Sequence, residues 1–155
     1  MINLVDELKK AYNEDAWHGS NTLMLIDSAN PQKVFTHPVP NAHSIAELVL
    51  HLTAWTEEVL DRISGKAAKE PSRGDWSLPR ENSEEEWKHI VADFKSANKS
   101  LIASINHLSS EHWNYFINDE RNRELGTGVS NAQLINGLIQ HHAYHSGQIA
   151  LLLKF

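Results

Sequence analysis

The chain ends in Gly137-Leu-Ile-Gln-His-His-Ala-Tyr-His-Ser-Gly-Gln-Ile-Ala-Leu-Leu-Leu-Lys-Phe155, and this stretch decides the fold. At 3.6 residues per turn, several residues in and just before it share one helical face about 60° wide: Leu134, Leu138, His145, Ile149 and Leu152. His141 lies at the edge of that face, one turn from His145. A neutral imidazole in an apolar stripe needs polar partners for both ring nitrogens. A shared metal ion is one partner that would serve both rings.

Working outward, four segments have helical periodicity. Three of them begin with a Ser-x-x-Glu/Gln capping box, in which the first and fourth residues satisfy each other's backbone amides. These boxes are Ser44–Glu47, Ser83–Glu86 and Ser130–Gln133. The sequence therefore predicts helices that begin at these three points, preceded by a first helix over about 3–29 with a kink at Gly19.

The connections between these helices are long and contain helix breakers. Three prolines lie in 30–43, and the segment 66–82 contains Pro71, Gly74 and Pro79. A connection as long as 66–82 without periodicity suggests a role in covering a site. Because convincing strand alternation is absent, we predict an all-α fold. It is a single domain, 1–155, built as a four-helix bundle with long loops.

The composition excludes several classes of function. The net charge of −6 and the lack of a Lys/Arg cluster argue against nucleic-acid binding. With ten histidines and no cysteine, a transition-metal site would have to use nitrogen and carboxylate ligands. The N-terminus lacks the apolar core of a signal peptide, and no run reaches the roughly 18 apolar residues that span a bilayer. We expect a cytoplasmic protein without a membrane partner.

A firmly held catalytic metal needs at least three protein ligands. The best third candidate beside His141 and His145 is His51, which borders the apolar face of the helix that begins at Ser44. The His-x-x-x-His spacing alone is a weak signal, and the alternative is two buried histidines bonded to carbonyls and water. Residue 142 is a histidine, so the chain lacks the glutamate that serves as general base in zinc proteases of the His-Glu-x-x-His type.

Two distant stretches carry a resemblance to a known family. The stretch Ser44-Ile-Ala-Glu-Leu-Val-Leu-His-Leu-Thr-Ala-Trp55 and the later His141-His-Ala-Tyr-His-Ser-Gly-Gln-Ile149 together resemble the DinB/YfiT-like superfamily of metal-associated proteins. Ala16-Trp-His-Gly19, His37-Pro38 and Arg62-Ile-Ser-Gly65 resemble one branch of it. The resemblance spans nearly the whole chain. His142 departs from it, since many relatives carry an acidic residue there.

The resemblance implies a bundle of the up-up-down-down type and frequent homodimers. It also implies a divalent metal ion held by His51, His141 and His145. A three-nitrogen site suits zinc, nickel, copper or iron, and of these we expect zinc or nickel. Members of the family include metal-dependent hydrolases and transferases that use a low-molecular-weight thiol as a second cofactor. We therefore expect a metal-dependent hydrolase or small-thiol S-transferase with a small-molecule substrate.

Three neutral imidazoles leave the positive charge of a metal uncompensated. That charge favours ionisation of a bound water, as hydrolysis requires, or stabilises a thiolate, as thiol transfer requires. Candidate residues for the substrate pocket are His18, Trp55, His142, Tyr144 and Gln148. No carboxylate has a spacing that marks it as a general base. Two alternatives stay open: a binding module that needs the metal but does not turn over its ligand, and a bundle in which the metal only pins the helices together.

Overall fold

The computed structural model describes residues 2–120 and 128–155. These residues form an all-α bundle in which no extended strand occurs, only two isolated bridges. The elements are α1 (Leu4–Tyr12), α2 (Thr22–Asp27), α3 (Ile45–Ile63), α4 (Glu84–Asn106), the 3-10 turn η1 (His112–Asn114) and α5 (Asn131–Leu152).

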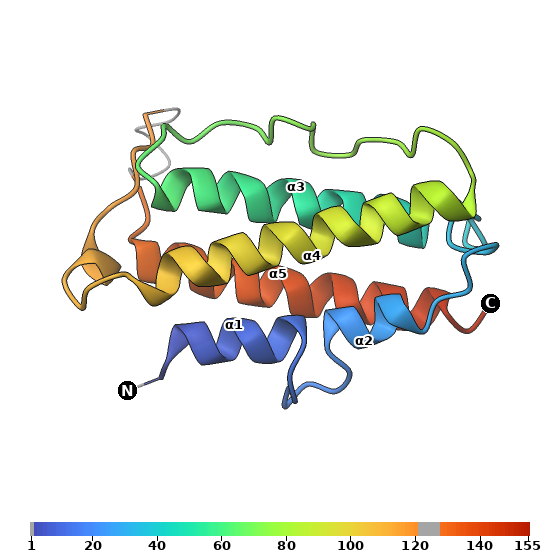
Figure 1. Cartoon of the computed structure of the whole chain (residues 1–155), viewed down its shortest axis with the longest axis horizontal. Helices are drawn as coiled ribbons and strands as arrows, with labels where there is room; N and C mark the ends of the chain where they lie inside the picture. The colour runs from blue at the N-terminus through green and yellow to red at the C-terminus, as the bar shows by residue number, and fades with distance from the viewer. Residues whose placement is uncertain (1, 121–127) are drawn as a thin grey trace.

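The long helix α3 packs against both α4 and α5, and α1 and α2 follow one another along α5 (Figure 1). α1, α2 and α5 run in one direction along the bundle, here called up, and α3 and α4 run in the opposite direction, here called down (Figure 1). With α1 and α2 taken together as the first helix of the bundle, the order is up-down-down-up and not the expected up-up-down-down, so one long crossover joins the parallel pair α3 and α4. Its location matters for function because it carries the chain back along the whole length of α3.

The predicted first helix over 3–29 is two helices in the structure. Asn21 explains the break, since its side-chain oxygen accepts a hydrogen bond from Met24 N and so caps α2. Its amide nitrogen donates to the Glu14 carbonyl across the gap. A residue that satisfies backbone groups on both sides favours a non-helical connection. Gly19, with φ of 120°, lies within that connection and not at a kink inside a helix.

The capping boxes at Ser44 and Ser130 are confirmed, each with both reciprocal hydrogen bonds. At Ser83 only half of the box forms. Its hydroxyl accepts from Glu86 N, but the Glu86 carboxylate pairs with the Arg80 guanidinium, 2.6 Å away. The tertiary ion pair thus takes the carboxylate that the local motif would have used.

Two apolar clusters form the core, one toward each end of α5. Ile135 and Leu138 belong to the first, and Ile149 and Leu152 to the second. The turns of α5 between them carry buried polar side chains, including His142, His145 and Ser146. The bundle therefore has a polar layer near its middle. None of the helices in the described part of the chain is both long and apolar enough to span a membrane.

The segment 64–83 between α3 and α4, here called the strap, crosses the outside of α3 (Figure 1). Although it has no regular secondary structure, side chains fix it at several points. Arg73 bonds Glu57 of α3 and Asp93 of α4, both at 2.7 Å, and the strap amide of Lys69 donates to Glu58. These ties hold the strap against α3, where it can contribute to a site.

Candidate metal centre

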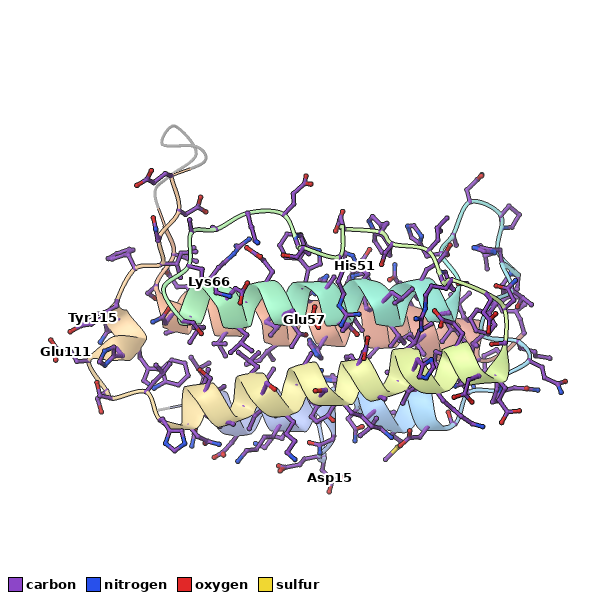
Figure 2. The ribbon with its side chains drawn as sticks, turned by 45° about the horizontal axis from the view of Figure 1, so that its top comes forward. Asp15, His51, Glu57, Lys66, Glu111 and Tyr115 are labelled. Atoms are coloured by element: carbon purple, nitrogen blue, oxygen red, sulfur yellow. The ribbon has the colours of Figure 1, made fainter. Side chains whose placement is uncertain are left out.

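The three predicted ligand residues come together. His51 projects from α3, and His141 and His145 project from successive turns of α5. One ring nitrogen from each lies within 4.8 Å of the other two. His141 Nε2 is central, 2.9 Å from His51 Nε2 and 3.0 Å from His145 Nε2. Figure 2 shows His51 on α3 beneath the strap.

The outer nitrogens of two of these rings fix where the ring protons lie. His51 Nδ1 is 2.8 Å from the carbonyl oxygen of Asp75, and His145 Nδ1 faces the side-chain oxygen of Gln148. Since a carbonyl can only accept, each Nδ1 carries the proton and donates it. In the neutral rings the Nε2 atoms of His51 and His145 therefore present lone pairs toward each other and toward His141.

These lone pairs cannot all be satisfied by hydrogen bonds within the cluster. Only His141 Nε2 can offer a proton, and one proton can be donated to His51 or to His145 but not fully to both. A divalent cation would accept all three lone pairs at once. The donor set, three imidazoles without thiolate, suits a borderline transition ion such as zinc or nickel. The cluster is thus compatible with a divalent metal.

Burial keeps the imidazoles of α5 neutral. It is the main cause that lowers the pKa of His141 to about 3, and the neighbouring His145 and His51 rings lower it further. The pKa of His145 is also lowered, again chiefly by burial, against the opposing effect of its hydrogen bond to Gln148. Because metal ligands must be unprotonated, both rings are ready to bind at neutral pH.

The strap forms the outer wall of this cluster. The Trp76 indole lies between two imidazoles, 3.8 Å from the His51 ring and 3.6 Å from the His43 ring, and is parallel to both within 6°. The neighbouring Asp75 places its carboxylate 3.2 Å from His51 Nδ1 and accepts a hydrogen bond from Trp55 Nε1 at 2.7 Å. The strap therefore orients the His51 ring in two ways: Asp75 contacts Nδ1 at the edge of the ring, and Trp76 stacks on its face.

A cavity of about 520 Å³ opens beside the cluster, between α3 and α5. His51, His141 and Asp75 line one part of it, and Arg62 lines it as well. The remaining wall is mostly apolar, formed by Trp55, Val59, Val129, Leu134 and Leu138. Such a space, apolar with a few convergent polar groups, is typical of small-molecule sites.

The structure separates the five predicted pocket residues into two groups. Trp55 lines the cavity, Gln148 bonds His145, and the exposed Tyr144 ring lies 5.0 Å from the His145 ring. These three are near the cluster, although Gln148 and Tyr144 do not line the cavity.

His142 and His18 are elsewhere. The His142 ring is fully buried on another side of α5, with its nitrogens 3.1 Å from the Leu138 carbonyl and from the Asn98 side chain. His18 is exposed in the segment between α1 and α2. Figure 2 shows Asp15 of that segment on the far side of the bundle from His51. The periodicity of α5 could not reveal the position of His142, since adjacent helical residues point about 100° apart and both directions here are buried.

Asp75 and Trp76 are the site residues that the sequence did not single out. Their position depends on the path of the strap, which no local pattern specifies. The available signal was the length of 66–82, which favoured a covering role for the whole segment without indicating a residue.

Comparisons with known proteins agree with this architecture. The sequence profile of the DinB superfamily matches residues 14–149. A crystal structure of a DinB-like protein from Bacillus cereus superposes with a TM-score of 0.65 at 16% identity, covering 86% of this chain and 81% of that one. No curated protein matches the chain significantly. Since the profile covers most of the chain and the fold agrees, this protein belongs to the DinB superfamily.

Proposed function

We propose that this protein is a divalent-metal-dependent enzyme acting on a small molecule, with His51, His141 and His145 as the metal ligands. The observation that carries the proposal is the convergence of three Nε2 atoms that hold too few protons to satisfy one another. Leaving such groups unpaired in a buried site is costly, and a bound cation removes that cost.

The cavity favours a functional metal over a purely structural one. Structural zinc sites are closed by four protein ligands, whereas catalytic sites keep a position open. Here three side chains converge, and two of them, His51 and His141, also line a cavity large enough for a small molecule. A cation at this place would supply a Lewis acid facing that cavity.

Hydrolysis is the reaction that the surrounding groups support best. Asp75 is the only carboxylate that lines the cavity among the described residues, and it lies at the histidine end. About half of its side chain is exposed to solvent, and it accepts a hydrogen bond from Trp55. We assign the Asp75 carboxylate the role of proton acceptor beside the metal. The backbone carbonyl of the same residue holds the His51 ring in place.

Elemental analysis of untagged protein, followed by zinc and nickel titration, tests the metal. We expect about one ion per chain. In a panel of ester and amide substrates, we expect hydrolysis only by the metal-loaded protein. Asp75→Asn should then reduce turnover while the bound ion is retained. A protein that takes up neither ion would contradict the proposal.

The same experiments separate the alternatives. A thiol transferase would act only when a small thiol is added with an electrophile. A binding module would be stabilised by a ligand without turning it over. If His145→Ala removes the ion, lowers the melting temperature by many degrees and no activity is found for the parent, the ion has only a structural role.

A further inference from the structure

The cavity beside the histidines has a second polar feature, which lies apart from the metal cluster. Arg62 of α3 lines the cavity, yet only 8% of this residue is exposed. Arginine is rarely buried to this degree unless its charge is paired. Its Nε donates to the Glu58 carboxylate at 3.0 Å, and Glu58 is itself 2% exposed. The pair is therefore a built element of the cavity wall and not a surface ion pair.

The guanidinium still has donors to offer. Its Nη2 donates once, to the Lys69 carbonyl of the strap at 3.0 Å, while Nη1 has no hydrogen-bond partner among residues 2–120 and 128–155. Guanidinium has five N–H donors in a planar fork that matches a carboxylate. Glu58 and Lys69 use two of them, so the remaining edge of Arg62 can bind an anionic group that enters the cavity.

The distances set the size of a ligand that would reach both ends. The Arg62 guanidinium carbon lies 5.7 Å from the Trp55 ring centroid, and the His51 ring centroid lies 6.4 Å from the Trp55 ring. Trp55 thus forms the wall between the two ends. The two ends are therefore at most about 12 Å apart, a span that three to four extended residues at about 3.5 Å each would cover.

The charges set the direction in which that ligand would bind. Asp75 is at the histidine end and disfavours an anionic group there, while Arg62 attracts one at the other end. Between them the wall is apolar, formed by Trp55, Val59, Leu134 and Leu138. A ligand that matches the cavity from one end to the other has an apolar middle and a carboxylate at one end only.

We infer that the substrate is a small amphipathic carboxylic acid whose carboxylate binds Arg62, whose apolar body lies along Trp55, and whose reacting group faces the three histidines. This inference rests on the proposed function, because it uses the metal end as the reacting end. The recognition of the carboxylate by Arg62 does not depend on the ion, and it can be measured separately.

Two hydroxamates that differ only at the far end provide the test. Zinc-loaded protein is titrated calorimetrically with suberic acid monohydroxamate and with octanohydroxamic acid, which has the same chain length and lacks the carboxylate. We expect the carboxylate to improve affinity about tenfold, the lower end of the range for charged hydrogen bonds because Glu58 already compensates part of the charge.

Variants assign that preference to Arg62. Arg62→Lys keeps a cation beside Glu58 but removes the fork, and the double variant Glu58→Gln/Arg62→Gln removes both charges together, which avoids an unpaired buried charge. We expect the preference to fall below about threefold in both. Arg73→Lys is the matched control, since Arg73 also pairs with a carboxylate of α3 but does not line the cavity, and it should keep the preference.

Equal affinity of the two hydroxamates for the wild-type protein would overturn the inference, as would an unchanged preference in both Arg62 variants. If the protein takes up no zinc, the proposed function fails, and the inference is then decided on EDTA-treated protein with octanoate and octanamide. Tighter binding of octanoate that is lost in Arg62→Lys supports carboxylate recognition at Arg62. Equal binding of the two overturns it.

Discussion

Two adjacent histidines of α5 have opposite surroundings. His142 is enclosed in the bundle, where both ring nitrogens face protein oxygen atoms of Leu138 and Asn98. His141 is half-buried beside the cavity, and within the described residues 2–120 and 128–155 its Nε2 faces only the Nε2 atoms of two other imidazoles. A neutral buried histidine needs one acceptor and one donor, and here the Leu138 carbonyl accepts from Nδ1 while Nε2 lies against the Asn98 side-chain amide, a group that carries both an oxygen and an NH2. A histidine that faces only nitrogen lone pairs needs an additional partner, and this difference marks the candidate site.

The largest expected effect separates the two environments directly. His145→Ala removes one of the three converging nitrogens, and we expect zinc affinity to fall by more than about 100-fold. Loss of a residue that only hydrogen-bonds a metal ligand has a smaller effect, about 10- to 100-fold. Competition with a chromophoric chelator measures the affinity, and circular dichroism checks the fold. A variant that still binds zinc as the wild type does would show that the cluster is not the metal site.

His142→Ala should have the reverse profile. It removes a fully buried ring together with its contact to Asn98, so we expect a loss of about 2–4 kcal/mol in the free energy of unfolding. Zinc affinity should stay within about threefold of wild type, since the ring points away from the cluster. Urea unfolding of EDTA-treated protein gives the first quantity and chelator competition the second. Loss of zinc binding with unchanged stability would contradict the comparison.

The pH dependence of stability gives a third contrast. Burial lowers the pKa of His142 to about 4 in the folded protein, whereas an unfolded histidine titrates near 6.5. Between these values the unfolded state binds a proton that the folded state excludes, so stability is lost as the pH falls from 6.5 toward 4. From pH 7 to pH 5 this one group should account for about 2 kcal/mol.

The measurement is urea unfolding of the metal-free wild type and of His142→Gln at both pH values. The wild type should lose more stability than the variant between pH 7 and pH 5. Parallel losses in the two proteins would mean that His142 is not the group responsible.

The smallest effect concerns the outer hydrogen bond of a ligand. Gln148→Ala removes the oxygen that accepts from His145 Nδ1, so the ring is less well oriented and zinc affinity should fall about tenfold. Gln148→Glu keeps an acceptor at the same place and should bind zinc at least as well as the wild type. Equal affinity of all three proteins would show that Gln148 has no part in holding the ring.

Much of the candidate site was predictable because it depends on spacing along two helices. The capping boxes at Ser44 and Ser130 fix where α3 and α5 begin, and the four-residue spacing places His141 and His145 on one side. The substrate-pocket role predicted for His142 and His18 is not supported by their positions, since neither lies at the cavity. The homodimer and the small thiol stay predictions.

By itself, the sequence determined the four-helix class, the starts of α3, α4 and α5 and the pairing of His141 with His145, because capping and periodicity are local properties of the backbone. Only the tertiary structure decided which side of α5 faces the cavity, since this helix contacts α1, α2 and α3 and is apolar in several directions. It also decided that the strap brings Asp75 and Trp76 onto His51, and that the Arg62–Glu58 pair lies in the same cavity wall. Those contacts join residues whose proximity depends on the path of a segment without periodic structure.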